Sequence, residues 1–440
     1  MTTSVVTPDN FTTAFNTLYS KYEYTWLRKY RQSGLDAFNG YPNRKDEDWR
    51  YINLAEFKKE SFILTDLMPE LNIATLLPYI LNDAINLIFI DGVFSNTLSH
   101  LDGLPKGIEV CNLADVLQNG DNISPELEAK ATNATNALEP LNKAFTQRGV
   151  IVEVAKNAKI KKSVQIIHVA TGRGGSFASF PRHIIKIGKS AEVDIIESYV
   201  GLDKQPYTIN VVSDIYLGAN AKVGYYRSIM EGAKAYHFAL SRVKLERDAK
   251  LLNFQFARRA NLIKSEIDIE IIGEGADAQL YGLTLGRLKR SMVQKTTVNH
   301  LAANATSNQI YKTILDDEAV GIFNGKIFID PIAQGTSAHQ ISKALPLSSD
   351  VEVNAQPQLE IGADDVSCTH GATLGQLNPE EVFYLRSRGI EPKLAKDILA
   401  LGFGEDILDN IDNSAIKQRF LLHLRSSFPT LNKMMGANNE

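Results

Sequence analysis

The stretch LGANAKV (Leu217–Val223) decides the fold, because shorter versions of it recur through the middle of the chain. Each copy joins a polar or glycine turn, an alanine and the apolar start of a predicted strand. The spacings between the alanines are 33, 30, 28 and 29 residues, and no long amphipathic helix separates the strands. Such a period is typical of a solenoid, so the sequence predicts a parallel β-helix with the alanines at equivalent corners. The five alanines are Ala158, Ala191, Ala221, Ala249 and Ala278.

The predicted β-helix occupies the middle of three regions. Short alternating runs rich in Val, Ile, Tyr and Thr fill residues 149–377, which form the expected β-helix core. A β-sandwich is the alternative for such strands, but it would not predict a nearly constant period. Residues 1–148 form a predicted N-terminal α/β region, and residues 378–440 form a predicted C-terminal helical domain. The expected fold class is therefore mainly β, with flanking helical regions.

Both outer regions carry helix signals. In the first region, apolar residues recur at three- and four-residue steps, which predicts one helix that ends before Gly34. In the last region, NPEE (378–381) and EP (391–392) mark two helix starts, and a third helix is expected over residues 414–427. The apolar face of the predicted N-terminal helix consists of Phe11, Phe15, Leu18, Tyr19, Tyr22 and Trp26.

The composition argues against several classes of protein. With 440 residues, 44% of them hydrophobic and 22% charged, the chain has the composition of an ordinary globular protein. A net charge of −4 gives no reason to expect nucleic acid, and the basic stretch RLKRSMVQK (287–295) is interpreted as a solvated face. The apolar run Ile85–Ile90 is too short to cross a membrane, and the N-terminus has no secretory signal. We therefore expect a cytoplasmic protein with no membrane or nucleic-acid partner.

The usual enzyme signatures are missing from the sequence. The run Gly188-Lys189-Ser190 resembles the end of a phosphate-binding loop, but His183 stands where that loop needs another glycine. There is no G-x-S-x-G elbow and no H-E-x-x-H pair. The sequence therefore predicts no catalytic residue and no enzyme activity.

The stretch DDVSCTHGAT (364–373) contains one of only two cysteines, Cys368, two residues before His370. On a strand, residues two apart face the same side, so Val366, Cys368 and His370 should share a face. A thiolate and an imidazole are metal ligands, yet a tetrahedral site needs four ligands and this stretch supplies two. Two interpretations stay open: a buried cysteine beside a hydrogen-bonded histidine, or an incomplete metal site completed by another chain. His300 and His339 are further candidate ligands.

Three separated motifs resemble one family. SCTHGATLGQLNPEEVFYLRSRGI (367–390), NRKDEDWRYINL (43–54) and GTSAHQISKALPLS (335–348) are similar, in this order, to motifs of the SufB/SufD family, whose members belong to the SufBCD iron–sulfur cluster assembly complex. The resemblance covers essentially the whole chain. The Cys-x-His form of the C-terminal motif and the count of two cysteines match the SufD type rather than the SufB type.

The resemblance implies a right-handed parallel β-helix and a non-catalytic scaffold subunit. It implies a heterodimer with SufB through the solenoid and a SufC ATPase docked on the C-terminal helices. It also implies a transient iron–sulfur cluster at the interface, with Cys368 and His370 as half of a shared site. A flavin of the whole complex and a homodimer of the isolated chain are left open. The expected ATPase-binding residues are Phe383, Tyr384, Arg386, Arg388, Ile398 and Leu399.

Two classes of enzyme share a β-helical architecture and compete with this interpretation. Carbohydrate-active β-helix enzymes use clustered carboxylates in an exposed groove, and they are commonly secreted. Hexapeptide-repeat acyltransferases show a strict six-residue period, which this chain lacks. The carbohydrate-active enzyme is the alternative function.

Overall fold

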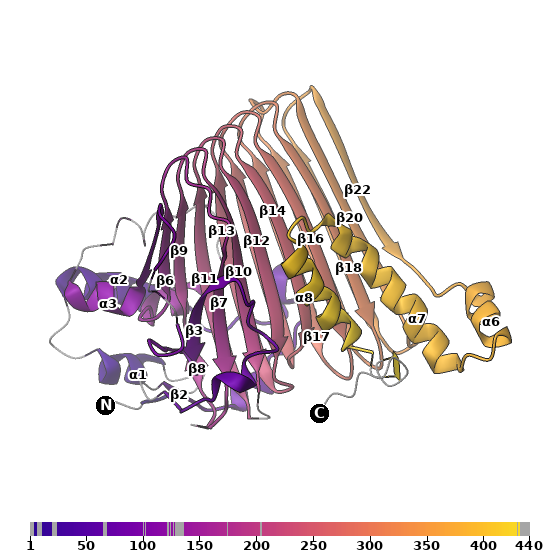
Figure 1. Ribbon diagram of the computed structural model, residues 1–440, viewed down its shortest axis with the longest axis horizontal. Coiled ribbons are helices and arrows are strands. Elements are labelled where there is room, and N and C mark those ends of the chain that lie inside the picture. The colour runs from indigo at the N-terminus through magenta and orange to yellow at the C-terminus, as the bar shows by residue number, and fades with distance from the viewer. Residues whose placement is uncertain are drawn as a thin grey trace.

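The centre of the molecule is a parallel β-solenoid made of two long sheets (Figure 1). From β9 (Arg182–Ile187) onward, consecutive strands alternate between the sheets, so each of these coils contributes one strand to each sheet. This confirms the predicted fold class. The computed structural model of the chain describes residues 4–6, 11–19, 24–64, 68–99, 101, 103–120, 123, 125, 127, 136–173, 175–202, 205–428 and 430–431.

The first sheet is parallel except where β4 pairs with β3. Its strands run from the N-terminal to the C-terminal end of the solenoid and cover most of the chain length. They are β3 (Ala84–Ile90), β4 (Val93–Phe94), β7 (Ser163–Ala170), β10 (Glu192–Gly201), β12 (Lys222–Glu231), β14 (Lys250–Arg259), β16 (Asp277–Gly286), β18 (Thr306–Leu315), β20 (Thr336–Pro346) and β22 (Val366–Leu374).

The second sheet is parallel except where β5 pairs with β6. A separate antiparallel pair joins β1 (Ser4–Val6) to β2 (Phe62–Leu64). The strands of the second sheet are β5 (Ile108–Asn112), β6 (Val150–Val154), β8 (Ala178–Ser179), β9 (Arg182–Ile187), β11 (Tyr207–Leu217), β13 (Ala235–Leu245), β15 (Leu262–Ile271), β17 (Ser291–His300), β19 (Val320–Ile329) and β21 (Glu352–Ile361).

The corners where the chain passes from the second sheet to the first, here called the alanine corners, explain the sequence period. From the corner between β6 and β7 to the corner between β19 and β20, each begins with a residue in the left-handed conformation, with φ between 56° and 72°. Asn, Asp and Gly adopt that conformation at the lowest cost, and the alanine that follows is small enough to stack on the next coil. The left-handed residues that precede an alanine are Asn157, Ser190, Asn220, Asp248, Gly275 and Asn304, and Gly335 takes the same position before Thr336.

Four of the five predicted corner alanines are confirmed, and the fifth is wrong. The backbone carbonyls of Ala158, Ala191 and Ala221 each accept a hydrogen bond from the coil that follows, in matching positions. The carbonyl of Ala249 accepts from Asp277, so its counterpart is Ala276 and not Ala278. Ala278 pairs instead with Leu251, two residues into the strand. The prediction failed because Gly275, and not an aspartate, takes the left-handed position in this coil.

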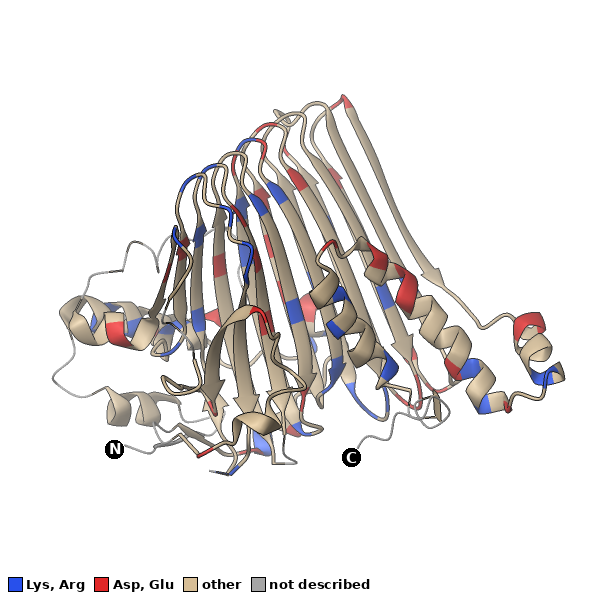
Figure 2. Cartoon of the chain, in the orientation of Figure 1, with Lys and Arg blue, Asp and Glu red and all other residues tan. Residues whose placement is uncertain are grey.

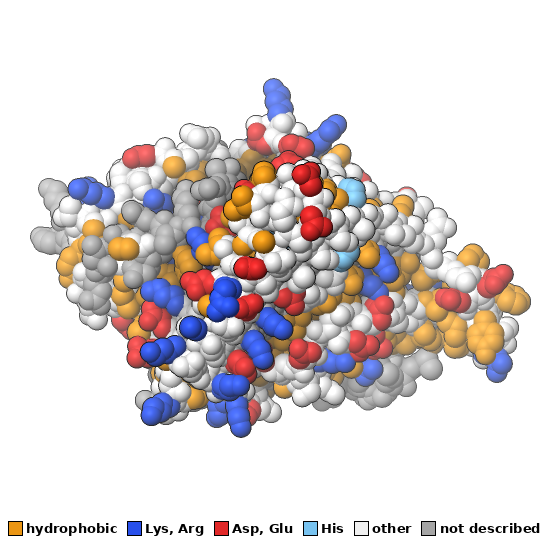
Figure 3. Space-filling view, turned by 90° about the horizontal axis from the view of Figure 1, so that it is seen from above, with side chains coloured by type: hydrophobic (Ala, Val, Ile, Leu, Met, Phe, Trp, Pro, Cys, Tyr) orange, Lys and Arg blue, Asp and Glu red, His pale blue; other side chains and the backbone are white. Residues whose placement is uncertain are grey.

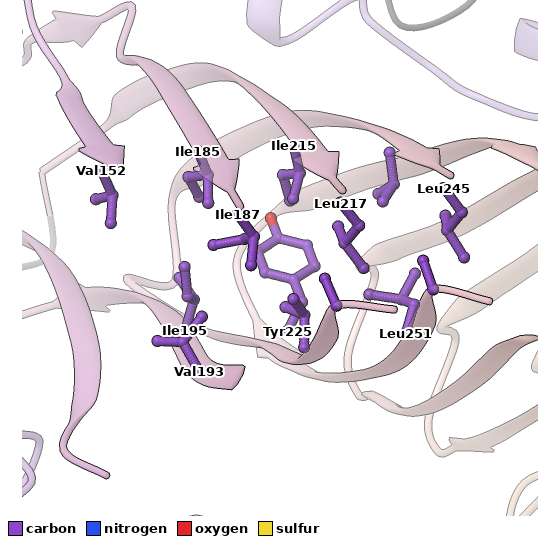
Figure 4. Packing of buried hydrophobic residues seen from close by; sticks show 14 of the residues in the cluster. Val152, Ile185, Ile187, Val193, Ile195, Ile215, Leu217, Tyr225, Leu245 and Leu251 are labelled. Carbon is purple, nitrogen blue, oxygen red and sulfur yellow. The ribbon is translucent and has the colours of Figure 1, made fainter. Parts of the chain in front are cut away.

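The core lies between the two sheets and is apolar near the alanine corners (Figure 4). Side chains such as Ile185, Ile215 and Leu245 from the second sheet meet Ile195 and Leu251 from the first (Figure 4). Further along the strands the interior becomes polar. Glu197, Arg227, Gln255, Gln309 and Gln340 are 0–6% exposed.

The N-terminal region covers the outer face of the second sheet near the start of the solenoid (Figure 1). Trp49 and Phe57 pack on Phe238, with ring centroids 6.2 and 5.5 Å away. Residues 84–112 also supply strands to both sheets, while the division of the chain into three domains stays a prediction. The helical elements of this region are α1 (Phe11–Leu18), α2 (Thr25–Ala37), η1 (Glu47–Trp49), η2 (Phe57–Lys59), η3 (Ile73–Thr75), α3 (Leu113–Asn119) and α5 (Glu139–Ala144).

The single predicted N-terminal helix is wrong, because its residues lie in two helices, α1 and α2. Tyr22 lies outside the described residues. Gly34 does not follow the helix but sits inside α2, where a Cβ atom would lie 2.6 Å from the backbone nitrogen of Ala144 in α5. The glycine therefore permits close packing of two helices rather than ending one.

The C-terminal helices begin where the sequence predicts. They are α6 (Pro379–Ser387), α7 (Pro392–Glu405), η4 (Asp406–Asn410) and α8 (Ser414–Arg425). The Asn378 side chain caps α6 by accepting from the nitrogen of Glu380 at 2.9 Å. α7 and α8 cover the outer face of the first sheet, where Phe420 packs on Phe254 and Phe256 (Figure 1). No helix in the described part of the chain is long and apolar enough to cross a membrane.

Candidate functional site

The C-terminal end of the solenoid is open. Among the described strands, β22 pairs only with β20, and β21 pairs only with β19. Most residues of β21 and β22 are exposed or half-buried, whereas most residues of the preceding strands are buried. Ile361 and Leu374 are 46% and 62% exposed. Two sheet edges therefore offer free backbone donors and acceptors at this end, the arrangement that accepts strands from another chain.

Cys368 and His370 lie on β22 and face the interior side of this open end. The pairing register places Cys368 beside Ala338 and His370 beside Gln340. Ala338 and Gln340 are 0% exposed inside the solenoid, and Cys368 packs on the same small cluster as Ala338. The prediction that both residues share one face is confirmed. Cys368 is half-buried with a free thiol, and His370 is exposed.

The two other candidate histidines do not join this pair. His339 is on the outer face of β20, where its ring nitrogens hydrogen-bond the hydroxyls of Thr369 at 2.8 Å and Ser337 at 3.2 Å. His300 is fully buried and hydrogen-bonds Ser307 at 2.8 Å. Within the described ranges, no group of three His, Cys, Asp or Glu side chains could hold a metal ion. Cys368 and His370 therefore form at most part of a ligand set.

Burial makes the Cys368 thiol harder to ionise. Partial desolvation raises the pKa of Cys368, while a backbone hydrogen bond from Ala338 acts in the opposite direction. A thiol must lose its proton to bind a metal ion, so an additional positive charge at this end would favour ligation.

A row of polar side chains behind His370 was missed by sequence reasoning. Thr296 donates to the Gln309 Oε1 atom at 2.7 Å, and Gln340 donates to the same oxygen at 3.3 Å. The buried Oε1 atom of Gln340 has no hydrogen-bond partner among the described residues. It lies on the strand next to His370, on the same face. Gln309 and Gln340 are 31 positions apart in the sequence, and Gln340 and His370 are 30 positions apart. Only the pairing of successive coils brings these side chains into one row.

Helix α6 projects from the end of the solenoid, and none of its residues is buried (Figure 1). Phe383 is 71% exposed and Tyr384 is 57% exposed. Hydrophobic side chains gather at this extremity in the view from above (Figure 3). Arg386 and Arg388 are also exposed, and the Arg388 guanidinium lies 5.1 Å from the centre of the Tyr384 ring.

The two predicted partner-binding residues on α7 are less accessible. Ile398 and Leu399 are half-buried, and Ile398 packs on the cluster that joins the C-terminal helices to the first sheet.

Comparison with known proteins identifies the family. The model "SUF system FeS cluster assembly, SufBD core domain" matches residues 168–403, which include β22, α6 and most of α7. The model "SufBD protein N-terminal region" matches residues 9–166. The chain belongs to the SufBD family. Its role therefore lies in iron–sulfur cluster assembly, and its relatives make it SufD-like.

Individual relatives match along most of their length. An iron–sulfur cluster assembly SufBD family protein of Synechocystis is 28% identical over 403 residues, which cover 88% of both chains. The iron–sulfur cluster assembly protein SufD of Escherichia coli is 27% identical over 395 residues, covering 89% of this chain and 90% of the relative. The chloroplastic protein ABCI7 of Arabidopsis thaliana is 22% identical over 414 residues, covering 91% and 86%.

Proposed function

We propose that this SufBD family chain is a non-catalytic scaffold that pairs with SufB through the open end of its solenoid. The observation that carries the proposal is the coincidence of two features at one place. The unpaired edges of β21 and β22 offer backbone hydrogen bonds to a partner, and the same coil presents Cys368 and His370. A half-site at a free edge is completed when a second chain adds the next coil.

The chemistry of the pair suits an iron–sulfur cluster as cargo. Thiolate and imidazole are both ligands of iron, and the partner would supply the remaining ones. His370, exposed at the edge, could also carry a proton near neutral pH. Cys368 contributes its thiolate only once the shared site lowers the cost of ionisation. The cluster is transient on the scaffold. No flavin is assigned to the residues of this chain.

The same proposal assigns docking of the SufC ATPase to α6 and the adjacent surface of α7. Two large exposed side chains, Phe383 and Tyr384, stand on a helix with no buried residue. Exposed aromatics flanked by arginines are typical of binding hot spots. Ile398 and Leu399 are the weaker part of this assignment, because they are half-buried against the first sheet.

The shared site is tested in the complex assembled from this chain, SufB and SufC. We expect His370→Ala to leave complex assembly intact and to reduce the amount of cluster, measured from iron, sulfide and the visible absorbance. His339→Ala is the matched control, because His339 lies one coil earlier on the opposite face. Cys368→Ser should cost less than His370→Ala. Full cluster loading with His370→Ala would reject the shared site.

SufC docking is tested by surface variants rather than by truncation, because deletion of the C-terminal helices would expose Phe254 and Phe256. Phe383→Ser together with Tyr384→Ser should weaken SufC binding in a pull-down while SufB binding persists. Leu422→Ser is the control, since this exposed residue lies on α8 (58% exposed). Equal SufC capture by all three proteins would contradict the assignment.

Two further points belong to the same proposal. Without SufB, the open ends of two copies could pair with each other, so the isolated chain is expected to form a homodimer. The site of action is expected to be the cytoplasm. The alternative, a carbohydrate-active enzyme, would use a cleft of about 500 Å³ lined by the carboxylates of Glu47, Asp48 and Glu270. Two of the three form ion pairs, Asp48 with Lys295 at 2.5 Å and Glu270 with Lys244 at 3.6 Å, which argues against a pair of free catalytic carboxylates.

A further inference from the structure

The amide side chain of Gln340 lies inside the solenoid, directly behind the proposed ligand His370. Gln340 is 0% exposed, and in the first sheet only β22 follows its strand within the described residues. The residue of β22 at the same register position is His370. Neighbouring strands are about 4.8 Å apart, and residues paired in a parallel sheet point to the same face. The two side chains are therefore neighbours in the last coils of the fold (Figure 2 shows these strands at the end that α6 follows).

The preceding coil sets the orientation of the Gln340 amide. Its Nε2 atom donates to the Oε1 atom of Gln309 at 3.3 Å, and the same oxygen accepts from the Thr296 hydroxyl at 2.7 Å. Because Gln309 presents its oxygen, Gln340 turns its NH2 group toward it. The Oε1 atom of Gln340 is then the free end of the amide, and it is buried without a hydrogen-bond partner in the described structure.

A glycine on the facing sheet makes room for this amide. A Cβ atom on Gly325 of β19 would lie 2.9 Å from Oε1 of Gln340 and still closer to its Nε2 atom. The register pairs Gly325 with Thr296 one coil earlier, and Thr296 with Ile267 one coil before that. This interior position therefore carries a side chain in the two preceding coils. In the coil of Gly325 the amide of Gln340 fills the space instead.

A purely structural role does not explain this arrangement. The residue before Gln309 in the same register line is Leu280, so an apolar side chain can occupy the line. A buried amide with an unmet carbonyl lowers stability, and an apolar side chain would avoid that loss. The ring of His370 also has no hydrogen-bond partner among the described residues. A neutral imidazole carries one N–H donor, so the unmet groups of the two neighbours are complementary.

We propose that Gln340 is a positioning residue whose Oε1 atom accepts a hydrogen bond from one ring N–H group of His370. The inference rests on the proposed function, in which His370 is a ligand of the shared site. A neutral histidine carries its proton on one nitrogen and offers the other to a metal ion, so the acceptor decides which nitrogen stays free. Histidines that bind metals generally hold such a bond through the second nitrogen. Gln340 thereby fixes the tautomer and the rotation of the ring before the cluster arrives.

The tautomer of His370 is the direct test, measured by NMR on the full, metal-free chain with isotope-labelled histidine. Its signal is assigned by its loss in His370→Ala. At about pH 8.5, where an imidazole is neutral, we expect one tautomer to dominate. Gln340→Leu should change the ratio of the tautomers about 2- to 10-fold, the range set by the free energy of one hydrogen bond.

Thr296→Val is the matched control, because it removes a hydrogen bond from the same polar row without touching His370. We expect the tautomer ratio to stay as in the unmodified chain. An unchanged ratio in Gln340→Leu, or an equal change in Thr296→Val, would overturn the proposal.

Two further variants test the acceptor without deleting the polar side chain. Gly325→Ala displaces the amide of Gln340 while keeping the residue, so it should change the tautomer ratio in the same direction as Gln340→Leu. Gln340→Glu keeps an acceptor oxygen and should keep one dominant tautomer. An unmodified ratio in Gly325→Ala, or a ratio in Gln340→Glu equal to that of Gln340→Leu, would count against the role of the acceptor.

Cluster loading separates this proposal from the proposed function. In the complex with SufB and SufC, Gln340→Leu and Gly325→Ala should retain less cluster than the unmodified chain, and Gln340→Glu should restore retention. Full loading with His370→Ala would reject the shared site, while the tautomer of the metal-free chain still decides whether Gln340 orients His370. If His370→Ala loses the cluster but Gln340→Leu changes neither the tautomer nor the loading, the shared site stands and the positioning role is rejected.

Discussion

Removal of Arg227 should destabilise the solenoid strongly, because it would leave Glu197 charged and buried inside the fold. Both residues face the interior; Glu197 is 0% exposed and Arg227 is 2% exposed. Arg227 donates from Nε and Nη2 to the same carboxylate oxygen at 3.2 and 2.9 Å. The other oxygen accepts from Ser213 at 2.6 Å and from Tyr225 at 2.7 Å. The carboxylate is therefore fully engaged in the native state.

The pKa of Glu197 gives the magnitude. Burial alone would raise it, but Arg227, His183 and the two hydroxyl donors lower it to about 2 from the ordinary value of 4.5. At 1.36 kcal/mol per pKa unit, this difference stabilises the fold by about 3 kcal/mol above pH 4.5. Because the folded-state pKa is depressed, that contribution is lost as pH falls from about 4.5 towards 2. Breaking a buried pair from one side typically costs about 3–5 kcal/mol.

We therefore expect Arg227→Met to lower the free energy of unfolding by about 3–5 kcal/mol at pH 7, measured by urea denaturation. The loss should shrink as pH falls, because burial without Arg227 raises the pKa of Glu197 above its ordinary value and protonation then removes the stranded charge. Lys326→Met is the matched control: its ion pair with Glu360 is exposed at 2.8 Å and should contribute at most about 1 kcal/mol. Glu197→Gln combined with Arg227→Met should recover part of the loss. An Arg227→Met loss no larger than that of the control, or one independent of pH, would refute the reasoning.

Three other predictions concern the fold. Asn220→Gly should leave the free energy of unfolding nearly unchanged, whereas Asn220→Val should lower it by at least about 1 kcal/mol. The reason is the left-handed φ of 59°, which disfavours a β-branched residue. Equal stability of the two variants in urea would contradict the left-handed conformation of this residue. Burial lowers the pKa of His183 to about 4, so thermal stability should fall as pH drops from 6.5 to 4. His183→Gln should make that part of the pH profile flatter. An unchanged slope in the variant would count against the contribution of His183. Phe420→Ala should cost about 3–5 kcal/mol in denaturation, because the ring is 1% exposed between α8 and the first sheet; a loss below 1 kcal/mol would show that the helices dock elsewhere.

The repeat was readable from the sequence because one backbone requirement recurs in most of the coils. Asn157, Asn220 and Asp248 have side chains suited to the left-handed conformation, and an alanine follows each. The prediction failed at Ala278, where Gly275 fills the same backbone position and shifts the motif by two residues. Glycine has no side chain that marks this position, so the similarity of the DAQL stretch to the other copies placed the corner at the wrong alanine. The long-range register, absent from the sequence, corrects it.

The N-terminal region was less predictable for a related reason. Its apolar residues share a helical period, but the period does not reveal that the chain breaks between α1 and α2. Gly34 also has a tertiary role, since it admits α5 at close range. Such contacts join segments more than a hundred residues apart, and periodicity over a short window does not contain them.

The candidate site was found from the sequence only as two residues on one strand face. Cys368 and His370 could be paired by the alternation of side chains, a strictly local rule. The exclusion of His339 and His300 needed the structure, because the first lies on the opposite face and the second is enclosed. The position of Gln340 beside His370 follows only from the pairing register of β20 and β22.

The position of Cys368 couples the proposed site chemistry to assembly. Val366, Cys368 and Leu359 are partly buried on the last apolar cluster of the interior, and the described structure places no further coil over them. A partner strand added to β22 would exclude water from the thiol, which by itself opposes ionisation. A bound iron ion has the opposite effect, because its charge stabilises the thiolate. In the proposed complex, pairing without metal would therefore keep the cysteine neutral, and pairing with metal would convert it into a ligand. Under this proposal the open end would favour ligation only when partner and cargo are present together, as an assembly scaffold requires.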